Sequence, residues 1–147
     1  MGNLPIATKF KVAAVVAWGG RTPGRVEVMA RILLAEDDED MRRFLVKALV
    51  KAGHDVSSFS EGLSAFEELK GAAFDLLLTD IVMPEMDGIE LARRAAELDP
   101  GLKIMFITGF AAVALHPDSR APKEAKVLSK PFHLRDLVAE VERMMAA

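Results

Sequence analysis

The chain has 147 residues, of which 51% are hydrophobic and 28% are charged, and its formal net charge is −3. This size and composition are those of one globular domain with a buried core, and the slightly acidic balance argues against the basic surface of a nucleic-acid-binding protein. The chain has no cysteine, which excludes disulfides, thiol nucleophiles and thiolate metal sites and favours a reducing, cytoplasmic location.

The first 28 residues differ in pattern from the rest of the chain. Basic Lys9 precedes the apolar stretch 12–18, which suggests a secretory signal, but no small-residue cleavage site follows it. The stretch is also far shorter than the roughly 20 residues that span a bilayer, and no longer apolar run follows, so we expect no membrane segment. We therefore favour Met29 as the initiator, and expect residues 1–28 to be a non-native or flexible extension and residues 29–147 to form the domain.

From residue 31 onward, short apolar runs alternate with helical patterns. The runs predict strands at 32–35, 54–59, 74–79, 103–107 and 126–128. The helical patterns predict an amphipathic helix that ends at Gly53 and further helices over 62–70, 89–98, 110–115 and 133–145. The side chains expected to face the core are Phe44, Leu45, Ala48 and Leu49, then Leu63, Phe66 and Leu69, and finally Leu134, Leu137, Val138, Val141 and Met145.

This strand–helix alternation, repeated five times, predicts an α/β fold with a doubly wound parallel sheet and right-handed crossovers. The run 74–79 is apolar almost throughout, which fits a central strand covered on both faces. The run 54–59 is more polar, which fits a strand at the edge of the sheet.

Several of the predicted strands end in charged side chains. Asp80 ends the third strand, Glu36 and Asp37 follow the first, and Lys130 follows the fifth and precedes Pro131. Because open α/β sheets bind ligands at the carboxyl ends of their strands, these groups predict a site for a divalent cation and a phosphoryl group.

Mg²⁺ prefers hard oxygen ligands in octahedral geometry and keeps several waters. We expect carboxylate oxygens from Asp37 and Asp80, the backbone carbonyl of Val82 as the chain turns away, and Glu36 acting mainly through a bound water. Without a cation these carboxylates repel one another, so the site is expected to bind one readily.

With the metal bound, Asp80 is placed as a nucleophile toward a phosphoryl donor. Phosphoryl transfer needs positioning and charge neutralisation, which Mg²⁺ and the Lys130 ammonium would supply. Thr108 ends the fourth strand and offers a hydroxyl to a phosphoryl oxygen, and Gly109 leaves room for the group. We also expect a cis peptide bond between Lys130 and Pro131.

This arrangement resembles the receiver domain of two-component response regulators over nearly all of residues 31–145. The matching elements are Glu36-Asp37, Asp80 with Met83-Pro84 and Asp87-Gly88, Thr108-Gly109, and Lys130-Pro131-Phe132. The resemblance implies a five-stranded, flavodoxin-like sheet in the order 2-1-3-4-5, with Asp80 as phosphoacceptor, Thr108 as switch hydroxyl and Lys130 as phosphate-contacting base. It also implies Mg²⁺ as cofactor and a phosphohistidine donor on a histidine kinase or histidine phosphotransferase.

The chain departs from the family at the aromatic switch position, three residues before the lysine, where Val127 stands. A ring rotation coupled to Thr108 is therefore not expected in its usual form, and Phe110, two residues after Thr108, is the aromatic that would substitute for it. Proline-rich residues 116–122 predict a short or irregular fourth helix.

No output domain follows the predicted receiver, so the chain resembles a single-domain regulator. Within the family, residues 29–38, 106–115 and 127–134 are similar to the CpdR group of stand-alone regulators. That resemblance implies a phosphorylation-controlled adaptor for ClpXP proteolysis in a cell-cycle phosphorelay, with ClpX as partner and possible recruitment to a cell pole.

Two other functions use similar residues. A phosphorelay shuttle or phosphate sink without a binding output needs the same site, so sequence does not separate it from the adaptor. A haloacid-dehalogenase-type phosphatase needs a second acid two residues after the nucleophile, where Val82 stands. We therefore expect no enzymatic activity beyond the protein's own phosphotransfer and dephosphorylation.

Overall fold

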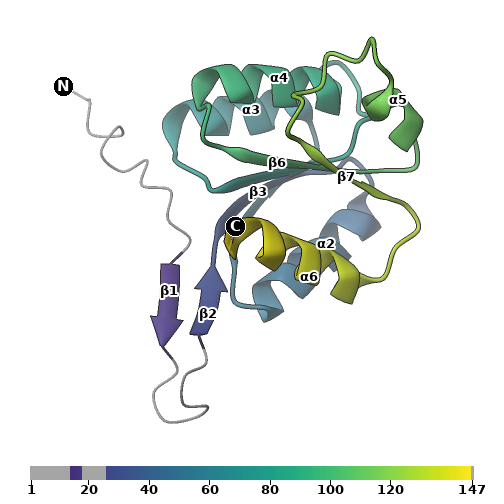
Figure 1. Ribbon diagram of the computed structural model, residues 1–147. Helices are drawn as coiled ribbons and strands as arrows, with labels where there is room; N and C mark the ends of the chain where they lie inside the picture. The colour runs from purple at the N-terminus through teal and green to yellow at the C-terminus, as the bar shows by residue number, and fades with distance from the viewer. Residues whose placement is uncertain (1–13, 18–25, 147) are drawn as a thin grey trace, which may run out of the picture.

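The computed structural model describes residues 14–17 and 26–146, and its helices lie on both faces of a central sheet (Figure 1). The sheet contains five parallel strands: β3 Arg31–Ala35, β4 Asp55–Phe59, β5 Leu76–Thr79, β6 Lys103–Thr108 and β7 Lys126–Ser129. Their spatial order is β4-β3-β5-β6-β7, which confirms the predicted 2-1-3-4-5 arrangement and the doubly wound fold.

Two layers of helices cover the sheet (Figure 1). The helices α2 (Glu39–Lys51) and α6 (Leu134–Ala146) pack on one face, and α3 (Gly62–Gly71) and α4 (Gly88–Leu98) pack on the other, while the short α5 (Ala111–Leu115) contacts β7. Successive strand residues point to opposite faces, so each strand contributes to two separate cores. In the central strand β5, Leu77 belongs to the α3/α4 core, whereas Leu76 and Leu78 belong to the α2/α6 core.

Capping residues set where the helices begin and end. Asp38 precedes α2 and accepts from the backbone N–H of Met41 at 2.9 Å, and Asp87 precedes α4 and accepts from that of Glu90 at 2.8 Å. Gly53 has a φ of 102°, a conformation that favours glycine and ends α2 as predicted.

Three side chains predicted to face the core are largely exposed: Phe44 by 57%, Leu63 by 43% and Leu134 by 38%. Those assignments were wrong. In α2 the core positions belong to Leu45 and Leu49, four residues apart on one face. Since successive helical residues are rotated by about 100°, Phe44 then points to the side of α2.

The predicted extension over residues 1–28 falls largely outside the described residues and stays a prediction. Within it, β1 (Ala14–Ala17) pairs with β2 (Val26–Met29) as an antiparallel hairpin, and only Ala30 separates β2 from β3. Across residues 14–17 and 26–146, no helix has the length and apolar character that crossing a bilayer requires.

Candidate functional site

The carboxyl ends of the parallel strands bring the predicted site residues to one edge of the sheet. Glu36 follows β3, Asp80 follows β5, Thr108 ends β6 and Lys130 follows β7. The backbone N–H of Lys130 donates to the carbonyl of Thr108 at 2.8 Å, which ties these two residues together. Glu36, Asp80 and Thr108 are buried, whereas Asp37, beside Glu36, is exposed.

The Lys130 ammonium joins two of the acids. Its Nζ donates to Oδ2 of Asp80 at 2.9 Å and to Oε1 of Glu36 at 3.3 Å. The other Asp80 oxygen, Oδ1, accepts from the backbone N–H of Ile81 at 2.6 Å. The Lys130–Pro131 peptide bond is cis, as predicted. Asp80 is thus held by a cation on one side and by its own loop on the other.

The three carboxylates form a cluster with the chemistry of a divalent-cation site. One ligand oxygen from each of Glu36, Asp37 and Asp80 lies within 4.8 Å of the other two. Hard carboxylate oxygens so close together suit Mg²⁺, and the exposure of Asp37 leaves room for water ligands. The residues present therefore fit this ion. Val82 lies in the loop two residues after Asp80, and its role as a carbonyl ligand stays a prediction.

The pKa values of Glu36 and Lys130 at this edge are shifted by burial and by neighbouring charges. Burial raises the pKa of Glu36 to about 7, the Asp80 charge adds to the rise, and the Asp38 N–H and Lys130 oppose it. For Lys130, burial disfavours the ammonium, but its hydrogen bond to Asp80 and the charge of Glu36 outweigh that effect and raise its pKa above the usual value. An additional cation would therefore stabilise the ionised carboxylates.

Thr108 has a hydrogen bond that connects this edge to α5. Its Oγ1 accepts from the backbone N–H of Phe110 at 2.8 Å, and Phe110 immediately precedes α5. Because a hydroxyl both accepts and donates, the Thr108 proton remains available for a phosphoryl oxygen. Val127 is half-buried in β7, and the Phe110 ring is 56% exposed.

Two contacts that position the site were not expected from the sequence. Gly88 is part of the matching element Asp87-Gly88, but that match gave no indication that a Cβ at this position would lie 1.8 Å from the carbonyl oxygen of Asp80. Arg42 donates from Nη1 to the backbone carbonyl of Glu36 at 2.9 Å. Both contacts involve backbone atoms, so residue type alone carried no signal for them.

A protein-family model described as the response regulator receiver domain matches residues 32–142. The chain belongs to this family. The receiver protein CpdR of Brucella abortus strain 2308 is 76% identical over 119 residues, which are 81% of this chain and 99% of CpdR. This agrees with the expected likeness to stand-alone receivers of the CpdR group.

Two further relatives place the receiver in a wider context. The sensor kinase CckA of the same Brucella strain is 37% identical over 119 residues, which are 79% of this chain but only 12% of the kinase. A crystal structure of a response regulator receiver protein from Sinorhizobium medicae WSM419 has 36% sequence identity and a TM-score of 0.74. The structural match covers 81% of this chain and 96% of the Sinorhizobium chain. A phosphorelay role fits the family.

Proposed function

We propose that this receiver is phosphorylated on Asp80 with the help of Mg²⁺ held by Glu36, Asp37 and Asp80. The observation that carries the proposal is the position of the Asp80 carboxylate, 2.9 Å from the Lys130 ammonium and within the cluster of three acids. Mg²⁺, when bound, supplies positive charge to the oxygens of the incoming phosphoryl group. The phosphoryl donor is a phosphohistidine on a histidine kinase or histidine phosphotransferase.

The transfer then proceeds at one carboxylate oxygen. An Asp80 oxygen forms a bond to phosphorus, the bond between phosphorus and the donor's imidazole nitrogen breaks, and the imidazole leaves with that electron pair. Lys130 offers its ammonium protons to the phosphoryl oxygens, and Thr108 offers its hydroxyl proton. The protein acts on its own phosphoryl group only, and we propose no other enzymatic activity.

Labelling with a small phosphodonor tests this assignment. Incubated with Mg²⁺ and acetyl phosphate, the protein is expected to gain one phosphoryl group by intact mass, and Asp80→Ala is expected to gain none. Asp87→Asn is the matched control, because asparagine caps a helix as well as aspartate does and Asp87 lies outside the acid cluster. Labelled Asp80→Ala protein would refute the assignment.

The phosphodonor is expected to dock on the seam between α2 and α6, two helices that begin three residues after Glu36 and four residues after Lys130. The groove there contains the exposed apolar side chains of Phe44 and Leu134 together with three basic residues, Lys47, Lys51 and Arg135. An amphipathic helix with an acidic rim complements such a groove.

The output we propose is a phosphorylation-controlled adaptor for ClpXP, as the likeness to CpdR supports. A cytoplasmic location and recruitment to a cell pole belong to the same proposal. A pulldown with ClpX, comparing phosphorylated and unphosphorylated protein, distinguishes this output from a shuttle or phosphate sink. The adaptor predicts ClpX binding that differs between the two forms, and equal or absent binding favours the shuttle.

A further inference from the structure

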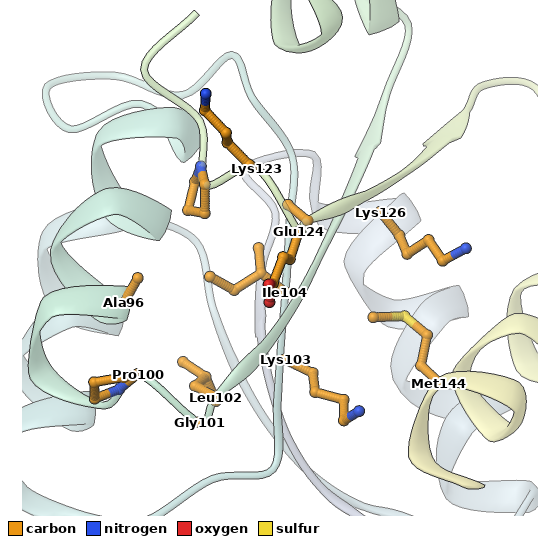
Figure 2. A pocket seen from close by; sticks show the side chains of 12 residues that line it. Ala96, Pro100, Gly101, Leu102, Lys103, Ile104, Lys123, Glu124, Lys126 and Met144 are labelled. Carbon is orange, nitrogen blue, oxygen red and sulfur yellow. The ribbon is translucent and has the colours of Figure 1, made fainter. Parts of the chain in front are cut away.

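An open cavity of about 630 Å³ lies at the amino end of β6, at the opposite end of that strand from Thr108 (Figure 2). Its volume is within the range of small-molecule sites. Apolar side chains form most of its surface: Ala96, Pro100, Leu102, Ile104, Pro122, Ala125 and Met144. They come from α4, the loop between α4 and β6, the start of β6, the loop before β7 and the end of α6. The cavity thus has an apolar lining contributed by several separate elements.

Two lysines stand at one side of this cavity. In Figure 2, Lys103 and Lys126 extend on either side of Met144, whereas Lys123 extends away from them. Across the described part of the chain, the Lys103 side chain has no ion pair, and Lys126 forms a long ion pair with Glu140 at 3.9 Å. The Lys103 ammonium is therefore available to an anion, and the exposed Lys126 ammonium can share its charge between Glu140 and an anion.

One acid lines the same cavity. Glu124 is exposed, and its carboxylate lies over Ile104 in the view of Figure 2. Three lysines line the cavity, and they outnumber Glu124 together with Glu140, the acid that pairs with Lys126, in a protein whose overall charge is −3. A bound anion would be attracted by Lys103 and Lys126 and repelled by Glu124. Removing the lysine charges and removing the Glu124 charge should therefore change anion affinity in opposite directions.

We propose that this cavity binds a small organic anion. Its apolar or aromatic body lies against Ile104 and Leu102, on the α3/α4 side of the sheet. Its negative group passes the start of β6, which has no β7 partner there, and lies near Lys103 and Lys126 on the side of Met144. The binding is independent of the phosphoryl chemistry at Asp80, so the proposal does not rest on the proposed function.

The test uses the full chain, and anilinonaphthalenesulfonate serves as an amphiphilic anionic probe. In a titration followed by ¹H–¹⁵N correlation spectra, the largest amide shifts are expected at Leu102, Lys103 and Ala125. Higher salt is expected to weaken binding, because exposed charges are screened. Shifts confined to the α2/α6 groove or to α5 would overturn the proposal.

Charge variants test the site in opposite directions. The double variant Lys103→Gln, Lys126→Gln is expected to weaken probe binding about fivefold, and Glu124→Gln is expected to strengthen it about twofold. The matched control removes two positive charges outside both the cavity and the α2/α6 groove, by Arg43→Gln and Lys70→Gln, and is expected to leave affinity unchanged.

A neutral analogue completes the design. N-phenylnaphthylamine keeps the aromatic body of the probe but lacks its sulfonate, so it is expected to bind more weakly. Equal affinity for the neutral analogue, or an unchanged affinity in the double variant at residues 103 and 126, would show that the site does not select anions.

Discussion

At the amino ends of β3, β4 and β5, backbone and guanidinium donors have hydrogen-bond partners, whereas at the carboxyl end one ammonium bonds to two of three clustered carboxylates. The backbone N–H of Arg31 donates to Oδ2 of Asp75 at 2.8 Å, and its guanidinium donates to the carbonyl of Ala73 at 2.8 Å. The backbone N–H of Ala30 donates to Nδ1 of buried His54 at 3.0 Å. These contacts tie together the starts of β3, β4 and β5.

At the carboxyl end of the sheet, acidic groups outnumber basic ones. Glu36, Asp37 and Asp80 lie within 4.8 Å of one another, and Lys130 is the cation that bonds to two of them. Burial without enough positive charge raises the pKa of Glu36 to about 7. Satisfied hydrogen bonds at one end thus favour folding, whereas surplus negative charge at the other lowers stability and favours cation binding.

The largest effect on stability is expected at the carboxyl end, from Gly88→Ala. The new Cβ would lie 1.8 Å from the Asp80 carbonyl oxygen, a backbone atom that cannot give way without moving the loop that follows β5. We expect a loss of about 3 kcal/mol in the free energy of unfolding, measured by urea denaturation. Gly71→Ala is the control, because a Cβ there meets nothing within 4 Å. Similar stabilities for the two variants would contradict the close approach.

The amino end is expected to respond next most strongly, to Asp75→Ala. This change removes the carboxylate that accepts from the Arg31 N–H, and we expect a loss of about 2 kcal/mol. Asp75→Asn keeps an acceptor oxygen and is expected to stay closer to wild type. Mg²⁺ should not alter either difference, because Asp75 lies at the other end of the sheet. A loss that depended on Mg²⁺ would mean that the two ends are not independent.

Mg²⁺ itself is expected to stabilise the protein through the carboxyl end. At a concentration ten times the Kd, binding to the folded state adds about 1.4 kcal/mol, which is visible as a rise in Tm. Asp37→Asn is expected to abolish that rise and, without Mg²⁺, to stabilise the protein slightly by removing repulsion. Asp38→Asn should keep the rise, because Asp38 caps α2 and lies outside the cluster. A rise that survives Asp37→Asn would place the ion elsewhere.

The sheet and the composition of the site could be predicted from the sequence because both depend on short-range patterns. Apolar runs separated by helical patterns gave parallel strands, and parallel strands carry whatever follows them to one edge. Asp80 and Lys130 are 50 residues apart in the chain, yet they meet at 2.9 Å for this reason. Their chemical roles, unlike their positions, stay predictions.

Other features could not be predicted because they depend on how elements pack. The exposure of Phe44 and Leu134 follows from the seam between α2 and α6, which no single helix pattern defines. The approach of Gly88 to Asp80 depends on the path of the whole loop between β5 and α4. Residue type indicated a turn there but not which backbone atoms would touch.

The smallest expected effect concerns Glu90, an acid with a surplus of cations rather than a shortage. Hydrogen bonds from Arg93 and Arg94 lower the pKa of Glu90 to about 2, in contrast to the raised pKa of Glu36. A lowered folded-state pKa stabilises the protein above the unfolded value of 4.5, and this contribution is lost as the pH falls toward 2. Glu90→Gln is therefore expected to lower Tm slightly at pH 6 and progressively less toward pH 3.5.

The effect stays small because this network is open to solvent, where ion pairs contribute little. Arg43, which lies near Glu39 and Asp40 on the exposed surface of α2, supplies a control. The Glu39→Gln variant is expected to shift Tm less than Glu90→Gln at pH 6, because Arg43 approaches Glu39 only to 3.7 Å. A Glu90→Gln difference that grew as the pH fell would reverse the predicted sign. It would mean that the arginines do not favour the ionised form of this acid.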